Sequence, residues 1–266
     1  MVRAAALCVG IDAVDEHHYR DGERGWDGLL RGAERHARDV ADALRAARFD
    51  TAVLLARDAT CGAVLAGLAR LASSARAGDL VAFYFSGHGG FPNVAGHRTP
   101  TLACFDRMLF AHELHAAFAA FAAGVRVVSL VDACHAGAVF YRGEEISPAP
   151  ADPDDPYGRE FPGYLDGVYA THQELYDGLI LTPPPPLRTE VLHFGACREE
   201  CTALDAGERG GVFTLALLDA WAGGTFTGSY QELFVAIARR TGRQVPTLMS
   251  AGPQIPSFPD QPAFAV

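Results

Sequence analysis

The chain has 266 residues, of which 49% are hydrophobic and 20% charged, enough to bury a sizeable core in one large α/β domain or two small ones. Its formal net charge of −10 argues against a protein that binds nucleic-acid phosphates through a basic surface. No apolar stretch reaches the ~18 residues that span a bilayer, and the first residues lack a signal-peptide pattern. We therefore expect a cytoplasmic protein with neither nucleic acid nor membrane as partner.

The six cysteines are scattered and show neither a disulfide framework nor a zinc-finger spacing. Histidines such as His112 and His115 lack a fourth ligand or a general base beside them, and prolines interrupt the acidic cluster around Asp154. We expect no metal ion and no organic cofactor.

The first half of the chain alternates short apolar runs with helical patterns. Strands are predicted over residues 4–9, 51–55, 80–86 and 125–131, and helices over residues 33–47, 63–72 and 111–122. The strands are β-branched and aromatic and are bounded by glycines, which is typical of interior strands of a parallel sheet. The alternation predicts an α/β fold, with crossover helices on both faces of the sheet.

The composition changes abruptly over residues 141–190, which hold nine of the sixteen prolines and ten acidic residues against three arginines. Such a segment is expected to contribute little to a core, and we interpret it as an insert or linker with short structure around residues 164–181. The apolar pattern resumes with a strand over residues 191–196 and a helix from about residue 211 to Gly223. Ser229 and Glu232 have the spacing of a capping box that opens a last helix to Arg240, and the proline-rich tail is expected to be extended.

His88 follows one predicted strand and Cys134 another, 46 positions later. The carboxyl ends of parallel strands meet at one rim of a sheet, so neighbouring strands would bring these two side chains together. A nucleophilic cysteine needs a base to generate its thiolate, and His88 is the candidate base. The competing interpretation is a loop histidine and a buried thiol without catalytic roles. His135 is a weaker candidate base, because its side chain should point away from that of Cys134.

The segments Tyr84-Phe85-Ser86-Gly87-His88-Gly89 and Asp132-Ala133-Cys134-His135-Ala136-Gly137 resemble those of the caspase and metacaspase superfamily of cysteine peptidases, especially its bacterial members. Residues 30–33, 195–199, 211–214 and 230–233 resemble further landmarks of these domains. The resemblance implies a three-layer α/β/α caspase-like fold with a mostly parallel central sheet of about six strands. It also implies a single domain over residues 1–266, with a large-subunit-like region (1–140), the linker (141–190) and a small-subunit-like region (191–266).

For the site, the resemblance implies His88 and Cys134 as a catalytic dyad and the Gly89 amide as an oxyanion donor. Ser86 and Asp132 each lie two positions before a dyad residue and so share its face of a strand. We expect both in the substrate pocket, where Asp132 would pair with Arg or Lys before the scissile bond. Metacaspases add an Asp where this chain has His36, so the expected acidic partner is missing. A capped loop end for Asp132 and a backbone hydrogen bond for Ser86 are the simpler alternatives.

The expected function is a cysteine endopeptidase acting on a protein or peptide substrate. Proteolysis of the linker, by the enzyme itself or by an upstream activating protease, is a regulatory hypothesis with Arg142, Arg159 and Arg188 as candidate cut sites. Bacterial relatives suggest a role in stress, cell death or antiviral defence. The rival hypotheses are a catalytically silent caspase-like adaptor or binding module, and another cysteine-dependent hydrolase or transferase using the same dyad.

Overall fold

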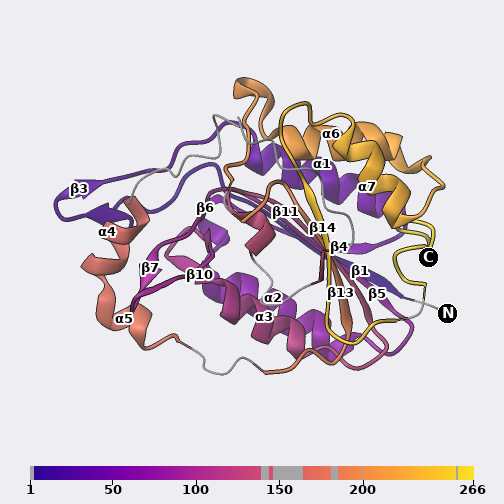
Figure 1. Cartoon of the computed structure of the whole chain (residues 1–266), viewed down its shortest axis with the longest axis horizontal. Helices are drawn as coiled ribbons and strands as arrows, with labels where there is room; N and C mark the ends of the chain where they lie inside the picture. Colours follow the sequence, from indigo (N-terminus) through magenta and orange to yellow (C-terminus); the bar gives the residue numbers. More distant parts are fainter. Residues whose placement is uncertain (1–2, 139–143, 146–163, 181–184, 200, 256) are drawn as a thin grey trace.

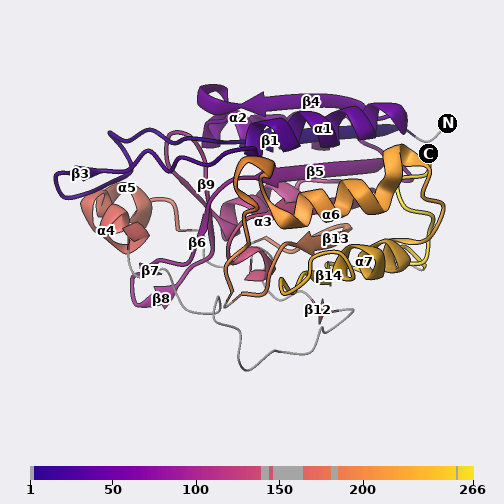
Figure 2. The same ribbon diagram turned by 90° about the horizontal axis from the view of Figure 1, so that it is seen from above.

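The computed structural model describes residues 3–138, 144–145, 164–180, 185–199, 201–255 and 257–266. The main sheet has the strand order β12-β14-β13-β11-β5-β1-β4, and Figure 2 shows it spread out from β4 to β12. Its strands are β1 (Ala4–Gly10), β4 (Asp50–Leu55), β5 (Leu80–Ser86), β11 (Arg126–Asp132), β12 (Glu144–Glu145), β13 (Glu190–Gly195) and β14 (Thr247–Ala251). The five strands from β13 to β4 are parallel, and β14 and the two-residue β12 are antiparallel to their neighbours.

Helices cover both faces of this sheet, which confirms the predicted three-layer α/β/α fold (Figures 1 and 2). One face carries α1 (Ala33–Ala46), α6 (Val212–Trp221) and α7 (Tyr230–Ala238), and the other carries α2 (Cys61–Ser74) and α3 (Ala111–Ala119). In β5, Phe83 and Phe85 pack on the α2–α3 side, and Ala82 and Tyr84 on the α1–α6 side. Burial on both faces explains why the strand reads as an unbroken apolar run.

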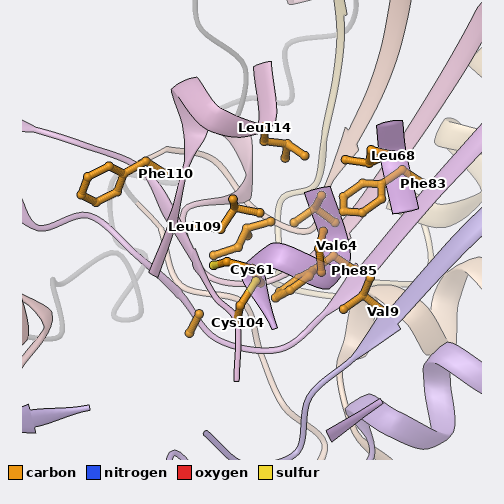
Figure 3. Packing of buried hydrophobic residues seen from close by; sticks show 14 of the residues in the cluster. Val9, Cys61, Val64, Leu68, Phe83, Phe85, Cys104, Leu109, Phe110 and Leu114 are labelled. Carbon is orange, nitrogen blue, oxygen red and sulfur yellow. The ribbon is translucent and has the colours of Figure 1, made fainter. Parts of the chain in front are cut away.

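The core beneath α2 and α3 is built from aromatic and branched side chains of the two layers. Figure 3 shows Val9, Phe83 and Phe85 of the sheet gathered with Val64 and Leu68 of α2. Each of these five side chains is at most 1% exposed. Truncating Phe83 or Phe85 to alanine would cost about 3–5 kcal/mol, so this layer anchors the strand that leads to His88.

Local capping fixes where the helices begin. Ser229 Oγ accepts from the Glu232 amide and the Glu232 carboxylate accepts from the Ser229 amide, so the predicted capping box is present. Asp12, just beyond β1, accepts through Oδ1 from the amides of residues 32–34 and so satisfies the first amides of α1 from a distant loop. This cap ties the loop before α1 to the carboxyl edge of the sheet.

Short elements lie along the carboxyl edge of the main sheet. Their strands of two or three residues are too brief to give a periodic signal in the sequence. A three-stranded sheet has the order β10-β9-β6, and two hairpins pair β2 with β3 and β7 with β8. Their bounds are β2 (Arg20–Asp21), β3 (Arg24–Gly25), β6 (Gly89–Gly90), β7 (Asn93–Val94), β8 (His97–Arg98), β9 (Thr101–Ala103) and β10 (Met108–Phe110). Single 3-10 turns are η1 (Ala56–Asp58), η2 (Ala136–Ala138), η3 (Gly207–Arg209) and η4 (Ala222–Gly224).

The expectation that residues 141–190 contribute little to the core is wrong for their second half. The expected short structure there is α4 (Tyr164–Thr171) and α5 (Gln173–Asp177), and Val168, Tyr169 and Tyr176 are buried in the cluster beneath α2 and α3. The Tyr176 hydroxyl accepts from the Met108 amide at 3.1 Å. The segment carries enough apolar and aromatic surface to pack, despite the acidic, proline-rich composition around it.

The C-terminal tail contains the strand β14 (Thr247–Ala251), which pairs with β13 and completes six principal strands. Prolines on both sides mask its pattern in the sequence. Within the described part of the chain, no helix is long and apolar enough to cross a membrane.

Candidate active site

His88 and Cys134 leave the sheet side by side. The strands β5 and β11 are parallel neighbours, and Ser86 is in register with Asp132, the last residue of each strand. His88 and Cys134 each follow two residues later. All four residues line one cavity of about 810 Å³ at the carboxyl edge of the sheet.

Gly89 packs directly on the main chain of Cys134. A Cβ at position 89 would overlap the Cys134 carbonyl oxygen and lie 3.1 Å from its amide nitrogen, so only glycine fits. After Cys134, His135 adopts a left-handed backbone conformation with φ 58°, and its amide donates to the Cys201 carbonyl. The turn therefore exposes Cys134 to the cavity while its two flanks are fixed.

The His88 ring is oriented by a backbone carbonyl, which no sequence motif predicts. His88 Nε2 lies 2.8 Å from the Gly28 carbonyl oxygen, which only accepts, so Nε2 carries the proton and Nδ1 is the unprotonated nitrogen. Gly28 has φ +58°, and the Trp26 ring packs at 4.7 Å from the His88 ring. Burial lowers the pKa of His88, and the Gly28 carbonyl partly opposes that shift.

Burial also raises the pKa of the Cys134 thiol, and a hydrogen bond with the Ala203 backbone opposes this by favouring the thiolate. The two pKa shifts point in opposite directions: His88 is held neutral and Cys134 is held protonated at neutral pH. The arrangement suits general-base removal of the thiol proton better than a preformed thiolate–imidazolium pair.

The Asp132 carboxylate is buried at one end of the cavity. Its Oδ2 accepts from the Thr214 amide at 3.0 Å and from Thr214 Oγ1 at 2.6 Å. Burial raises the pKa of Asp132 to about 6, against the lowering effect of the Thr214 hydrogen bonds. The Tyr84 hydroxyl joins the network through Thr214 Oγ1 at 2.6 Å and through the Ser86 side chain. Ser86 and Asp132 thus belong to one connected polar cluster facing the cavity.

His36 occupies the position where metacaspases have an Asp, and it lies outside the cavity lining. Its ring is buried beneath Gly210, where a Cβ would come within 2.6 Å of the ring. An acidic group reaches the cavity from a different segment, Asp205 on the loop before α6. Asp205 acts electrostatically on Asp132 and on His88, in each case raising the pKa. No motif in the sequence marked Asp205.

His135 is held by contacts of its own. Its Nδ1 lies 2.7 Å from the Glu199 carbonyl and therefore donates to it, and its ring stacks on Phe91 with centroids 5.6 Å apart. These contacts make it a poorer base candidate than His88. Among the described residues, no group of three or more His, Cys, Asp or Glu side chains is placed to hold a metal ion.

A family model for the caspase domain matches residues 4–258 of the chain. The chain belongs to the caspase-domain family. A crystal structure of a Geobacter sulfurreducens protein resembles this caspase domain with a TM-score of 0.82 and 30% sequence identity, covering 99% of each chain. Caspase-1 from Spodoptera frugiperda resembles it with a TM-score of 0.57 and 13% identity, covering 93% of this chain and 86% of that one, and shares the fold. A search of curated proteins gives no match.

These comparisons confirm the expected superfamily and the caspase-like fold. They support a peptidase-family domain. The roles of individual residues rest on the geometry described above.

Proposed function

We propose that this caspase domain is a cysteine endopeptidase in which Cys134 is the nucleophile and His88 the general base and acid. The observation that carries the proposal is the meeting of His88, Cys134 and Gly89 at the ends of two neighbouring strands, in one cavity. The orientation of the His88 ring by Gly28 supports it, since a base must present an unprotonated nitrogen.

The cycle begins when His88 Nδ1 takes the thiol proton and the sulfur attacks the carbonyl carbon of the scissile bond. The amides of Gly89 and Cys134 are the proposed donors to the oxyanion. His88 then returns the proton to the leaving amine as the C–N bond breaks, which leaves a thioester on Cys134. Water hydrolyses the thioester with His88 again as base, releasing the acid product and the free thiol.

We propose a preference for Arg or Lys before the scissile bond. Asp132 and Asp205 line the same end of the cavity, and Ser86 adds a hydroxyl beside them. A guanidinium would offset the cost of keeping the Asp132 carboxylate charged inside the protein. Asp205 would then be the second acidic residue of this pocket, replacing the metacaspase Asp whose position is occupied here by His36.

Peptide cleavage with matched variants tests the catalytic proposal. Cys134→Ala and His88→Ala should each lower cleavage by at least ~1,000-fold, whereas Cys201→Ser and His97→Ala, outside the cavity lining, should stay near wild type. A peptidyl electrophile should add its mass to Cys134 alone. A folded wild-type chain that cleaves no peptide and resists the electrophile would favour a silent caspase-like adaptor.

Three arginines of the linker are the candidate sites for regulatory cleavage. Arg142 and Arg159 lie outside the described residues, and Arg188 is exposed just before β13. Cleavage there, by this enzyme or an upstream protease, is proposed to regulate the site. We also propose a cytoplasmic location and, from the family resemblance, a role in stress, cell death or antiviral defence.

A further inference from the structure

The cavity has a second end, chemically unlike the acidic one. Trp26, Tyr164 and Leu165 line it there, and all three are only partly buried. The centroid of the Trp26 ring lies 4.7 Å from that of the His88 ring and 5.3 Å from that of the Tyr164 ring. The catalytic steps proposed above use none of this apolar surface.

This wall is preformed. The Tyr164 hydroxyl donates to the Arg24 carbonyl at 2.9 Å, which fixes the start of α4 against the β2–β3 hairpin. Leu165 fills the space beside Gly90, where a Cβ would overlap its Cδ1 atom. One residue on, the Asp166 carboxylate accepts from the Asn93 amide at 2.6 Å. Figures 1 and 2 both place α4 beside this hairpin, at the end of the molecule opposite the two termini.

The chemistry fixes which part of a substrate this wall faces. His88 must reach the leaving nitrogen to protonate it, so the chain after the scissile bond departs on the His88 side of Cys134. The residue before the bond occupies the acidic end with Asp132. Trp26, whose ring packs on that of His88, is therefore placed next to the residue that follows the bond.

We infer that Trp26, Tyr164 and Leu165 form an apolar subsite that selects a large aliphatic or aromatic residue directly after the scissile bond. The inference rests on the proposed function and deepens it. It also assigns a role to the second half of the linker segment, because Tyr164 and Leu165 open α4. Two arginines share this end: Arg24 is exposed, and Arg98 donates to the Phe91 carbonyl and lies 3.9 Å from Asp166. Selection of an acidic residue is thus the alternative that the test must separate.

The test uses peptides with Arg before the bond and Gly, Leu, Phe or Asp after it, cleaved by the full chain. Wild type should prefer Leu and Phe over Gly by roughly tenfold in kcat/KM, the size expected for one partly enclosed apolar side chain. Leu165→Ala should reduce that ratio severalfold. Leu175→Ala, an exposed leucine on α5, is the matched control and should keep the wild-type ratio.

Both kcat/KM values of a ratio are measured on the same enzyme sample, so the fraction of unfolded protein cancels from the ratio. Equal rates for Gly and Leu in wild type, or a ratio that Leu165→Ala leaves intact, overturn the subsite while the proposed peptidase stands. A wild-type preference for the Asp peptide overturns the apolar subsite and indicates that Arg24 and Arg98 select an acidic residue. Absence of cleavage of every peptide overturns the proposed function and the subsite together.

Discussion

Asp132 is a carboxylate held inside the protein at the acidic end of the cavity, with a pKa raised to about 6 by burial. The raised pKa means that this group gains a proton as the pH falls through 6, and it then no longer attracts a cationic side chain. Burial lowers the pKa of His88, so the two groups shift in opposite directions. A ratio of rates for two substrates that differ only in charge removes the contribution of His88 and leaves that of Asp132.

Comparison of Arg with its neutral isostere citrulline, before the scissile bond, measures the selectivity alone. The ratio of the two kcat/KM values should be constant above pH 7 and fall about tenfold per pH unit well below pH 6, since kcat/KM reports ionisation of the free enzyme. Thr214→Val removes one hydrogen bond that stabilises the carboxylate and should move the fall to higher pH, whereas Thr214→Ser should not. A ratio independent of pH from 5 to 8 contradicts the role of Asp132.

Asp205 is exposed, so its effect should be smaller than that of the buried Asp132. Asp205→Asn should lower kcat/KM for the Arg peptide about three- to fivefold, the value of one screened charge, and leave the citrulline peptide unchanged. Asp132→Asn should lower it by ~100-fold. Asp260→Asn removes an exposed carboxylate outside the cavity and serves as control; an equal loss in this variant would show only a general charge effect.

Among individual residues, the sequence predicts those whose side-chain chemistry is unusual at their position. It misses those that act through the backbone. His88 and Cys134 stand at strand ends next to glycines, and strand periodicity places Ser86 and Asp132 beside them. Gly28 acts through a carbonyl oxygen, which every residue has, so no residue type marks it. Asp205 comes from a loop whose path depends on tertiary contacts, and an exposed Asp in a loop is unremarkable in sequence.

Among the elements, β13 supports the turn that follows Cys134. His193 on this strand is fully buried, with Nε2 donating to the Ala136 carbonyl at 2.8 Å and Nδ1 3.1 Å from Ser129 Oγ. Burial lowers the pKa of His193 from the usual 6.5 to about 4. The folded state thus binds this proton less readily than the unfolded chain, and stability is lost as the pH falls from 6.5 towards 4.

The shift corresponds to about 3 kcal/mol of unfolding free energy across that window, as an upper value. His193→Gln keeps a donor but does not titrate, so its curve of unfolding free energy against pH should be flatter than that of wild type. Urea unfolding at several pH values from 7 to 4 measures both curves. The half-buried His18, with a pKa also near 4, titrates in both proteins and cancels from the comparison. Parallel curves for the two proteins contradict this account.

The sequence predicts the helices and strands that are long and show a regular apolar periodicity. The five parallel strands and the helices between them follow from apolar periodicity. The short structure around α4 and α5 is predicted, but its burial is missed because the average composition of residues 141–190 is acidic and proline-rich; Val168 and Tyr176 are as buried as the core of α2. The strand β14 is held by its pairing with β13 rather than by its own pattern.

For the whole molecule, the sheet runs without a break from the region before the linker to the region after it. Strand β13 lies between β11 and β14, so its removal would expose two strand edges. The second half of the linker is also docked, through α4 and α5 on the N-terminal part of the chain. The His18 and His172 rings stack there with centroids 4.2 Å apart, and the Tyr176 hydroxyl lies 2.7 Å from His18 Nε2.

A chain cut at Arg188 should therefore remain one particle. Denaturing electrophoresis should show two pieces, while size-exclusion chromatography under native conditions should show one species that elutes with the uncut chain. Arg188→Gln should block this cut, and Cys134→Ala should stay whole if the enzyme cuts itself. Pieces that elute separately would contradict the packing described here. A wild-type chain that stays uncut by intact mass and is fully active would instead remove linker cleavage from the mechanism, because the site would then be complete before any bond in the linker is broken.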